Sequence, residues 1–133
     1  MDKSVVLGVV TNNDKVLLVK RKPTEGMLRW QFPGGIVEKN ETVEDAIVRE
    51  LKEETGIDVK ALTRIGERVH PYTNRYMAYI ACEYLSGGIS VSDDDLECAE
   101  WVGIDSLDEH FTTPLFDKVA DYLSHIPKEY CLV

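Results

Sequence analysis

The sequence has few cysteines and no long apolar run, and both shortages exclude classes of protein. Its three cysteines, Cys82, Cys98 and Cys131, are odd in number, lie far apart and include no Cys-x-x-Cys pair. We therefore expect neither a disulfide framework nor a thiolate zinc site, and reduced thiols in a cytoplasmic protein are the simpler interpretation. No apolar run approaches the roughly 20 residues of a membrane helix, and residues 1–13 lack the apolar segment of a signal peptide. We expect neither secretion nor a membrane partner.

Basic residues are also scarce. The chain has 15 Lys and Arg residues against 24 Asp and Glu residues, which gives a formal net charge of −9. Sequence-independent binding of DNA or RNA needs a basic face that neutralises phosphates, so we expect no nucleic-acid polymer as a partner. A small phosphorylated ligand remains possible, because bound divalent cations can invert the local sign of the field.

Histidine is equally rare, since the chain has three histidines that are scattered as His70, His110 and His125. A histidine metal cluster or a Ser-His-Asp triad therefore has little support.

What remains is the composition of one globular domain. The chain has 133 residues, of which 44% are hydrophobic and 29% are charged, so we expect a single domain over residues 1–133. Runs of strand-forming residues predict strands at 4–11, 15–22, 59–70, 75–85 and 96–104, with turns at 12–14 and 71–74. Amphipathic patterns predict helices at 42–55 and 113–126. This order predicts an α/β domain with a mixed sheet and helices on its faces.

The helix expected at 42–55 has signals at both ends. Thr42 is a good N-cap, and Asp45 three residues later completes a variant of the capping box. Gly56 stands where a left-handed residue ends a helix, and Ile57 supplies the apolar contact that often follows.

Three carboxylates interrupt the packing side of this helix. At about 100° per residue, one apolar stripe consists of Val43, Ala46, Ile47 and Leu51. Glu50, Glu53 and Glu54 fall inside or beside that stripe. A solvated face is the usual explanation of charged residues on a helix, but other charged residues already occupy the opposite side. Neighbouring carboxylates repel unless cations lie between them, and oxygen ligands suit Mg²⁺ or Mn²⁺ better than zinc.

The residues around these carboxylates follow a specific spacing. Gly35 is followed by five residues, Glu41, seven residues, and then Arg49-Glu50-Leu51-Lys52-Glu53-Glu54-Thr55-Gly56-Ile57. This stretch resembles the sequence box of the MutT-like Nudix hydrolases, which reads Gly, five residues, Glu, seven residues, Arg-Glu-hydrophobic-any-Glu-Glu-any-Gly-hydrophobic. It departs from that pattern at no position. The preceding Phe32-Pro33-Gly34 and the expected order of strands also look like that family, so the resemblance covers nearly the whole chain.

The resemblance implies an α/β/α sandwich with a mixed sheet between helices, and metal-assisted hydrolysis of a nucleoside diphosphate linked to another moiety. By position it implies Glu50, Glu53 and Glu54 as metal ligands, joined by the carbonyl of Gly35. It also implies that Arg49 orients Glu53. Such a site suits phosphoanhydride cleavage, because metals neutralise phosphate charge and activate a water molecule. Glu41 is interpreted as helix-start electrostatics and not as a ligand.

A fourth carboxylate often comes from a loop outside the box in this family. In residues 92–102, SDDDLECAEWV, the candidates are Asp95, Glu97 and Glu100. Glu97 is favoured by its spacing before Trp101, and a solvated acidic loop is the alternative. Either Glu53 or Glu97 could act as general base.

Three further residues are candidates for substrate binding. Arg21 closes the second expected strand, where family members commonly carry a phosphate-binding arginine, and a solvated strand end is an equally good interpretation. Trp30 and Phe32 precede the box, and each offers an aromatic face to a base. Core packing is the favoured alternative for Phe32.

The substrate stays open between two nucleotide classes. Pro71 lies near the position where ADP-ribose-cleaving relatives tend to carry a proline, although a turn explains it equally well. Thr112 and Thr113 stand where relatives that act on 8-oxoguanine nucleotides place an amide side chain to bind the base. This difference argues against strict specificity for 8-oxoguanine nucleotides. The compact length and the sequence WQFPGG favour a (d)NTP pyrophosphohydrolase that releases a nucleoside monophosphate and pyrophosphate. The alternatives are an ADP-ribose or nucleotide-sugar pyrophosphatase and a non-catalytic nucleotide sensor. A homodimer is possible by analogy with relatives.

Overall fold

A computed structural model describes residues 4–22, 30–70, 74–111 and 115–126. The elements in chain order are β1 (Val5–Asn12), β2 (Lys15–Arg21), β3 (Trp30–Gln31), β4 (Gly34–Ile36), α1 (Val43–Thr55), β5 (Asp58–Val69), β6 (Tyr76–Ser86), β7 (Leu96–Gly103), the 3₁₀ turn η1 (Ile104–Ser106), α2 (Leu107–His110) and α3 (Asp117–Ser124). Each of the five strands and both helices expected from the sequence has a counterpart. In the described residues, no helix is both long and apolar enough to cross a membrane.

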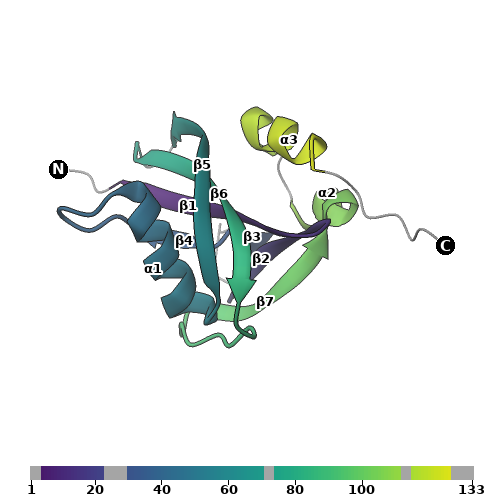
Figure 1. Ribbon diagram of the computed structural model, residues 1–133, viewed down its shortest axis with the longest axis horizontal. Helices are drawn as coiled ribbons and strands as arrows, with labels where there is room; N and C mark the ends of the chain where they lie inside the picture. The colour runs from purple at the N-terminus through teal and green to yellow at the C-terminus, as the bar shows by residue number, and fades with distance from the viewer. Residues whose placement is uncertain (1–3, 23–29, 71–73, 112–114, 127–133) are drawn as a thin grey trace.

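The strands form one seven-stranded mixed sheet in the order β3-β2-β1-β6-β5, with β4 also paired to β1 and β7 to β2. β1 and β6 run parallel, from Val5 opposite Met77 to Thr11 opposite Glu83. The other pairs are antiparallel. Helix α1 lies on one side of the sheet, and α2 and α3 lie on the other (Figure 1). This confirms the predicted α/β sandwich.

Alternation along the strands gives the sheet two apolar faces. Val6 and Val10 of β1 face α1, whereas Val9 faces α3. The first core lies under α1 and consists of Val6, Val10, Leu17, Ala46, Ile47, Leu51, Ile57, Val59, Ala78, Ile80 and Cys82. The second core lies under α2 and α3 and consists of Val9, Val16, Leu18, Phe32, Tyr79, Val102, Leu107, Val119 and Leu123.

The hairpin between β1 and β2 turns at the expected residues. Asn12 pairs with Lys15 as the last residue of β1, and Asn13 has a φ of 58°. Asparagine tolerates this left-handed conformation better than most residues, which explains why the turn forms here. Of the other predicted turn, at 71–74, residues 71–73 lie outside the described residues.

The second helix is shorter than the sequence pattern predicted. We expected a helix at 113–126, but α3 begins at Asp117, and residues 113 and 114 lie outside the described residues. Phe116 has φ −55° and ψ 129°, so it stands in extended backbone before the helix. Leu115 and Phe116 still pack against the second core. The apolar pattern therefore predicted their burial correctly but not their backbone conformation.

Candidate active site

Helix α1 begins and ends where its sequence signals predict. The Thr42 side chain accepts a hydrogen bond from the backbone N–H of Asp45 at 3.0 Å. Gly56 has a φ of 79°, and its N–H donates to the carbonyl of Lys52 at 3.1 Å. These two caps fix where the helix begins and ends, and the burial of Ala46, Ile47 and Leu51 in the first core determines which side chains face the sheet.

The three carboxylates of α1 differ in their exposure. Glu54 is buried at 7% exposure among the apolar residues of the helix. The side chain of Glu50 is 15% exposed, and that of Glu53 is 60% exposed. This order follows the predicted stripe, in which Glu54 lies near the centre and Glu53 at the edge. The acidic face therefore runs from the interior to solvent over one turn of helix.

Burial strongly perturbs Glu54. Loss of hydration and, to a smaller extent, the charge of Glu50 raise its pKa to about 7, while a hydrogen bond from the N–H of Gly34 at 3.1 Å acts in the opposite direction. Burial also raises the pKa of Glu50, against the lowering effect of Arg49. The two carboxylates thus share a poorly hydrated place on the helix.

The glycines Gly34 and Gly35 of β4 leave no room for a side chain. A Cβ at Gly35 would overlap the carboxylate of Glu50, and a Cβ at Gly34 would overlap the carbonyl oxygen of Val6 in β1. Gly35 pairs with Val6 in the sheet, so the first strand holds this pair of glycines in place. The requirement for glycine therefore comes from the close approach of the backbone to the carboxylates and to β1.

Arg49 forms hydrogen bonds on the side of α1 next to β4. It donates to both oxygens of Glu41, from Nε at 2.7 Å and from Nη2 at 2.8 Å, and Nη2 also donates to the carbonyl of Ile36 at 3.1 Å. Its Nη1 donates to Glu50 at 2.9 Å and to Glu53 at 3.2 Å. The expected contact with Glu53 exists, but it is one of several.

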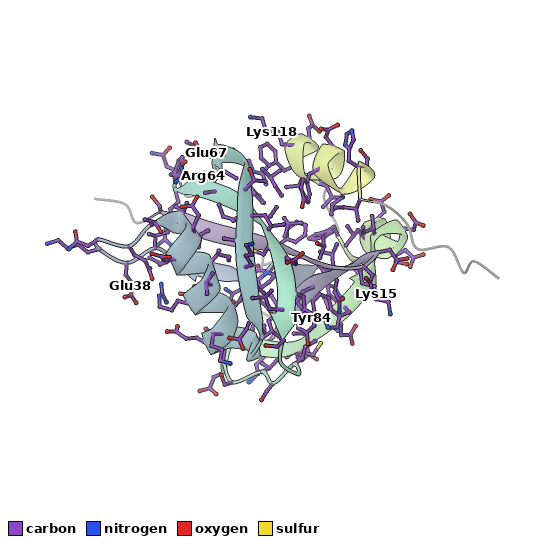
Figure 2. The ribbon with its side chains drawn as sticks, in the orientation of Figure 1. Lys15, Glu38, Arg64, Glu67, Tyr84 and Lys118 are labelled. Carbon is purple, nitrogen blue, oxygen red and sulfur yellow. The ribbon has the colours of Figure 1, made fainter. Side chains whose placement is uncertain are left out.

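The structure gives Glu41 a role that the sequence interpretation missed. Glu41 forms a bidentate ion pair with Arg49, which lowers the pKa of Glu41 to about 2, and it also accepts from the N–H of Glu38 at 3.0 Å. Glu38 lies on the loop before α1 (Figure 2) and approaches Arg49 at 3.7 Å. The interpretation as helix-start electrostatics overlooked this pairing. Glu41 anchors the guanidinium that contacts Glu50 and Glu53.

A second group of charges approaches Glu54 from outside the helix. The charge of Asp93 raises the pKa of Glu54, and the charge of Arg21 lowers it. Arg21 ends β2 and pairs with Leu96 of β7, so the structure brings the predicted phosphate-binding arginine to this site. Asp93 was not among the sequence candidates. Glu97, which was, is exposed on β7, and its predicted role as ligand or base stays a prediction.

The two aromatic candidates have different surroundings. Phe32 is 6% exposed and packs in the second core against Tyr79 and Phe111, at ring distances of 6.5 and 5.3 Å. This burial favours the core interpretation. Trp30 is half-buried on β3, with the Lys20 Nζ 5.4 Å from its ring centre and the His110 ring edge-on at 4.9 Å. Trp30 therefore remains a candidate base-binding residue. Its neighbour His110 was not indicated by the sequence.

Comparison with known proteins identifies the family. The sequence model of the NUDIX domain matches residues 1–123. The chain belongs to the Nudix family. The NAD-capped RNA hydrolase NudC of Pseudomonas aeruginosa (strain LESB58) is 37% identical over 99 residues, which cover 74% of this chain and 35% of that protein. The ADP-ribose pyrophosphatase of Methanocaldococcus jannaschii is 35% identical over 103 residues, which cover 75% of this chain and 61% of that protein.

This Nudix chain is also similar to solved structures. A MutT structure described for Aliivibrio salmonicida and Vibrio cholerae superposes with a TM-score of 0.70 at 25% identity, and covers 92% of this chain and 97% of that one. The chain spans about a third of the length of the NudC relative, since the match covers 35% of that protein.

The Nudix carboxylates fit a hard divalent cation by their chemistry. Glu50 and Glu54 are poorly hydrated oxygen donors beside the β4 glycines, where an added Cβ at Gly35 would overlap the Glu50 carboxylate. Within the described residues, no group of three or more His, Cys, Asp or Glu side chains is arranged to hold a metal ion. The Glu53 side chain is 60% exposed and pairs with Arg49 at 3.2 Å. The residue types present match the oxygen donors that a hard divalent cation prefers.

Proposed function

We propose that the chain is a divalent-metal-dependent hydrolase that cleaves a phosphoanhydride bond in a nucleoside diphosphate linked to another moiety. The observation that carries this proposal is the pair Glu50 and Glu54, held with little hydration against Gly34 and Gly35 of β4. Packing alone favours apolar residues on that stripe, so two carboxylates there need a chemical reason. Membership of a family whose relatives are named hydrolases and pyrophosphatases supports the same conclusion.

The residues that would hold Mg²⁺ or Mn²⁺ are Glu50, Glu53, Glu54 and the carbonyl of Gly35. When bound, the cation would neutralise phosphate charge and lower the pKa of a water molecule. Arg49 keeps the Glu50 and Glu53 carboxylates in fixed orientations through its bonds at 2.9 and 3.2 Å. Arg21 places a positive charge near Glu54, where it would bind a terminal phosphate. Glu53, or a carboxylate of the loop before β7, would take the proton of the attacking water.

The names of the relatives favour one substrate class. NAD and ADP-ribose each contain a pyrophosphate that joins two ribose-bearing groups, and both appear in the names of relatives at 37% and 35% identity. We therefore place a substrate of the ADP-ribose type first. A (d)NTP, which the compact length of the sequence favoured, is the second candidate, supported by the similarity to MutT over 97% of that chain.

The test is a panel of ADP-ribose, NAD, nucleotide sugars and nucleoside triphosphates, assayed with and without Mg²⁺. Nucleoside monophosphate from ADP-ribose or NAD alone supports the first candidate, and pyrophosphate from a triphosphate supports the second. Glu50→Gln keeps the shape of the side chain and removes its charge, so we expect it to abolish Mg²⁺-dependent turnover. Turnover within a few-fold of the parent in this variant would contradict the proposed metal site. If the folded parent hydrolyses no substrate of the panel, the result would favour a non-catalytic nucleotide sensor.

A further inference from the structure

The loop between β6 and β7, residues 87–95, lies against the C-terminal end of α1 (Figure 1). The Ser92 hydroxyl donates to the backbone carbonyl of Glu53 at 2.7 Å, and the N–H of Ser90 donates to the carbonyl of Thr55 at 2.8 Å. Carbonyls in the last turn of a helix have no partner within the helix. The loop therefore supplies donors for the end of the helix that carries the carboxylates.

The start of this loop approaches the helix end backbone to backbone. Gly87 has a φ of 98°, and a Cβ there would come within 2.9 Å of the carbonyl oxygen of Gly56. Tyr84 lies near the end of β6 (Figure 2), and its hydroxyl donates to the carbonyl of Gly87 at 2.6 Å. Its ring packs edge-on against Trp101 at 5.3 Å. These contacts before Ser92 therefore set the position of the start of the loop relative to α1.

The far end of the loop is fixed to a different element. The N–H of Lys22, which follows β2, donates to the carbonyl of Asp95 at 3.0 Å, and Arg21 pairs with Leu96. The loop thus connects the end of α1, with Glu53 and Glu54, to the end of β2, with Arg21. Its own Asp93 lies between these two attachments.

We propose that Ser92 is a positioning residue of the active site, whose bond to the Glu53 carbonyl sets where the α1 carboxylates stand relative to the Asp93 loop and Arg21. This inference rests on the proposed function. The Glu53 side chain is 60% exposed, and its contact at 3.2 Å is with Arg49 of the same helix. The position of the Glu53 backbone therefore limits the positions that its carboxylate can take. Release of the carbonyl lets the last turn fray and weakens the alignment of ligands that a bound cation needs.

The test compares three variants of the full chain. Ser92→Ala removes the hydroxyl, and Ser92→Thr keeps a hydroxyl in the same place. Ser90→Ala is the matched control, because Ser90 bonds to Thr55 through its backbone N–H, which alanine retains. Mn²⁺ affinity is measured by electron paramagnetic resonance without substrate, and kcat and KM are measured on the substrate that the panel identifies. Thermal melting is recorded in parallel.

For Ser92→Ala we expect Mn²⁺ binding to weaken by about three- to ten-fold, the scale of one lost hydrogen bond. We expect kcat at sub-saturating metal to fall with it, while KM for the nucleotide stays near that of the parent. Ser92→Thr should restore both, and Ser90→Ala should match the parent. Equal Mn²⁺ affinity and kcat in Ser92→Ala and Ser90→Ala would overturn the inference. A lower melting temperature with unchanged Mn²⁺ affinity would overturn it too, because Ser92 would then cap the helix and do nothing else.

The result also separates this inference from the proposed function. An active parent with an unaffected Ser92→Ala variant overturns the inference alone. A folded parent that binds no Mn²⁺ and cleaves nothing in the panel overturns the proposed function, and the inference with it.

Discussion

The raised pKa of the buried Glu54 carboxylate predicts how the stability of the chain depends on pH. Its pKa is about 7 in the folded chain and 4.5 as the ordinary value. The folded state therefore holds the proton more tightly than the unfolded state. Between these two pH values the free energy of unfolding must fall as the pH rises, because the unfolded chain has released this proton while the folded chain still holds it. Glu54→Gln removes this titration and keeps an oxygen that can accept from the N–H of Gly34 at a similar place.

The size of the effect follows from the shift. At about 1.4 kcal/mol per pKa unit, the full shift is worth on the order of 3 kcal/mol. Part of it comes from the charge of Glu50, which salt and solvent screen, so we expect about 2 kcal/mol at pH 8. For a chain of this length this corresponds to a melting temperature lower by about 7 °C.

The assay is thermal melting of metal-free protein in EDTA from pH 5 to pH 8. We expect the melting temperature of the parent to fall across this range and that of Glu54→Gln to fall by about 7 °C less. Glu53→Gln, which removes the same charge from a side chain that is 60% exposed, controls for net charge. Added Mg²⁺ should restore the parent at pH 8 and have little effect on Glu54→Gln. Parallel pH profiles for parent and Glu54→Gln would refute the argument.

Four further substitutions test the surroundings of the carboxylates. Gly35→Ala places a Cβ on the Glu50 carboxylate, so Mn²⁺ affinity should fall by about ten-fold while circular dichroism stays native; unchanged affinity would mean that the close approach of Gly35 does not shape the site. Arg49→Lys cannot make the paired bonds to Glu41, so kcat should fall by about 10- to 100-fold, and a rate near the parent's would contradict the anchoring role of Glu41. Asp93→Asn should lower kcat more than Glu97→Gln, because the charge of Asp93 acts on Glu54; the reverse order would return the role of loop carboxylate to Glu97.

The sequence predicted α1 well because its signals are local. Thr42 and Gly56 fix the ends within one turn, and the 3.6-residue period then orders the burial of Glu54, Glu50 and Glu53. The short strands β3 and β4, of two and three residues, escaped prediction because they are too short to show any period. Leu115 and Phe116 misled the prediction of α3, since apolar spacing reports burial and not backbone conformation.

The parts of the site that the sequence missed all depend on contacts across the fold. Glu41 precedes the N-cap Thr42 and so lies outside the helix, where the helical period does not predict its contact with Arg49 eight residues later. Ser92 reaches Glu53 across 39 residues, and this contact brings the loop with Asp93 to the helix end. In an acidic stretch such as residues 93–97, spacing alone cannot select the carboxylate that approaches the helix, because the choice depends on where the loop is fastened.

The position of Glu54 connects stability with function. It lies on the same stripe as Ala46, Ile47 and Leu51, where a leucine would extend the first core and avoid the cost of a poorly hydrated charge. A chain that keeps glutamate there gives up stability above neutral pH, unless a cation or a proton compensates the charge. A cost of this kind is expected where function requires it, and Glu50, Arg21 and the carbonyl of Gly35 are the neighbouring groups that would share a bound cation or phosphate. Glu54 carries the most poorly hydrated carboxylate of α1. Metal binding should therefore stabilise the folded chain mainly by compensating the charge of this residue.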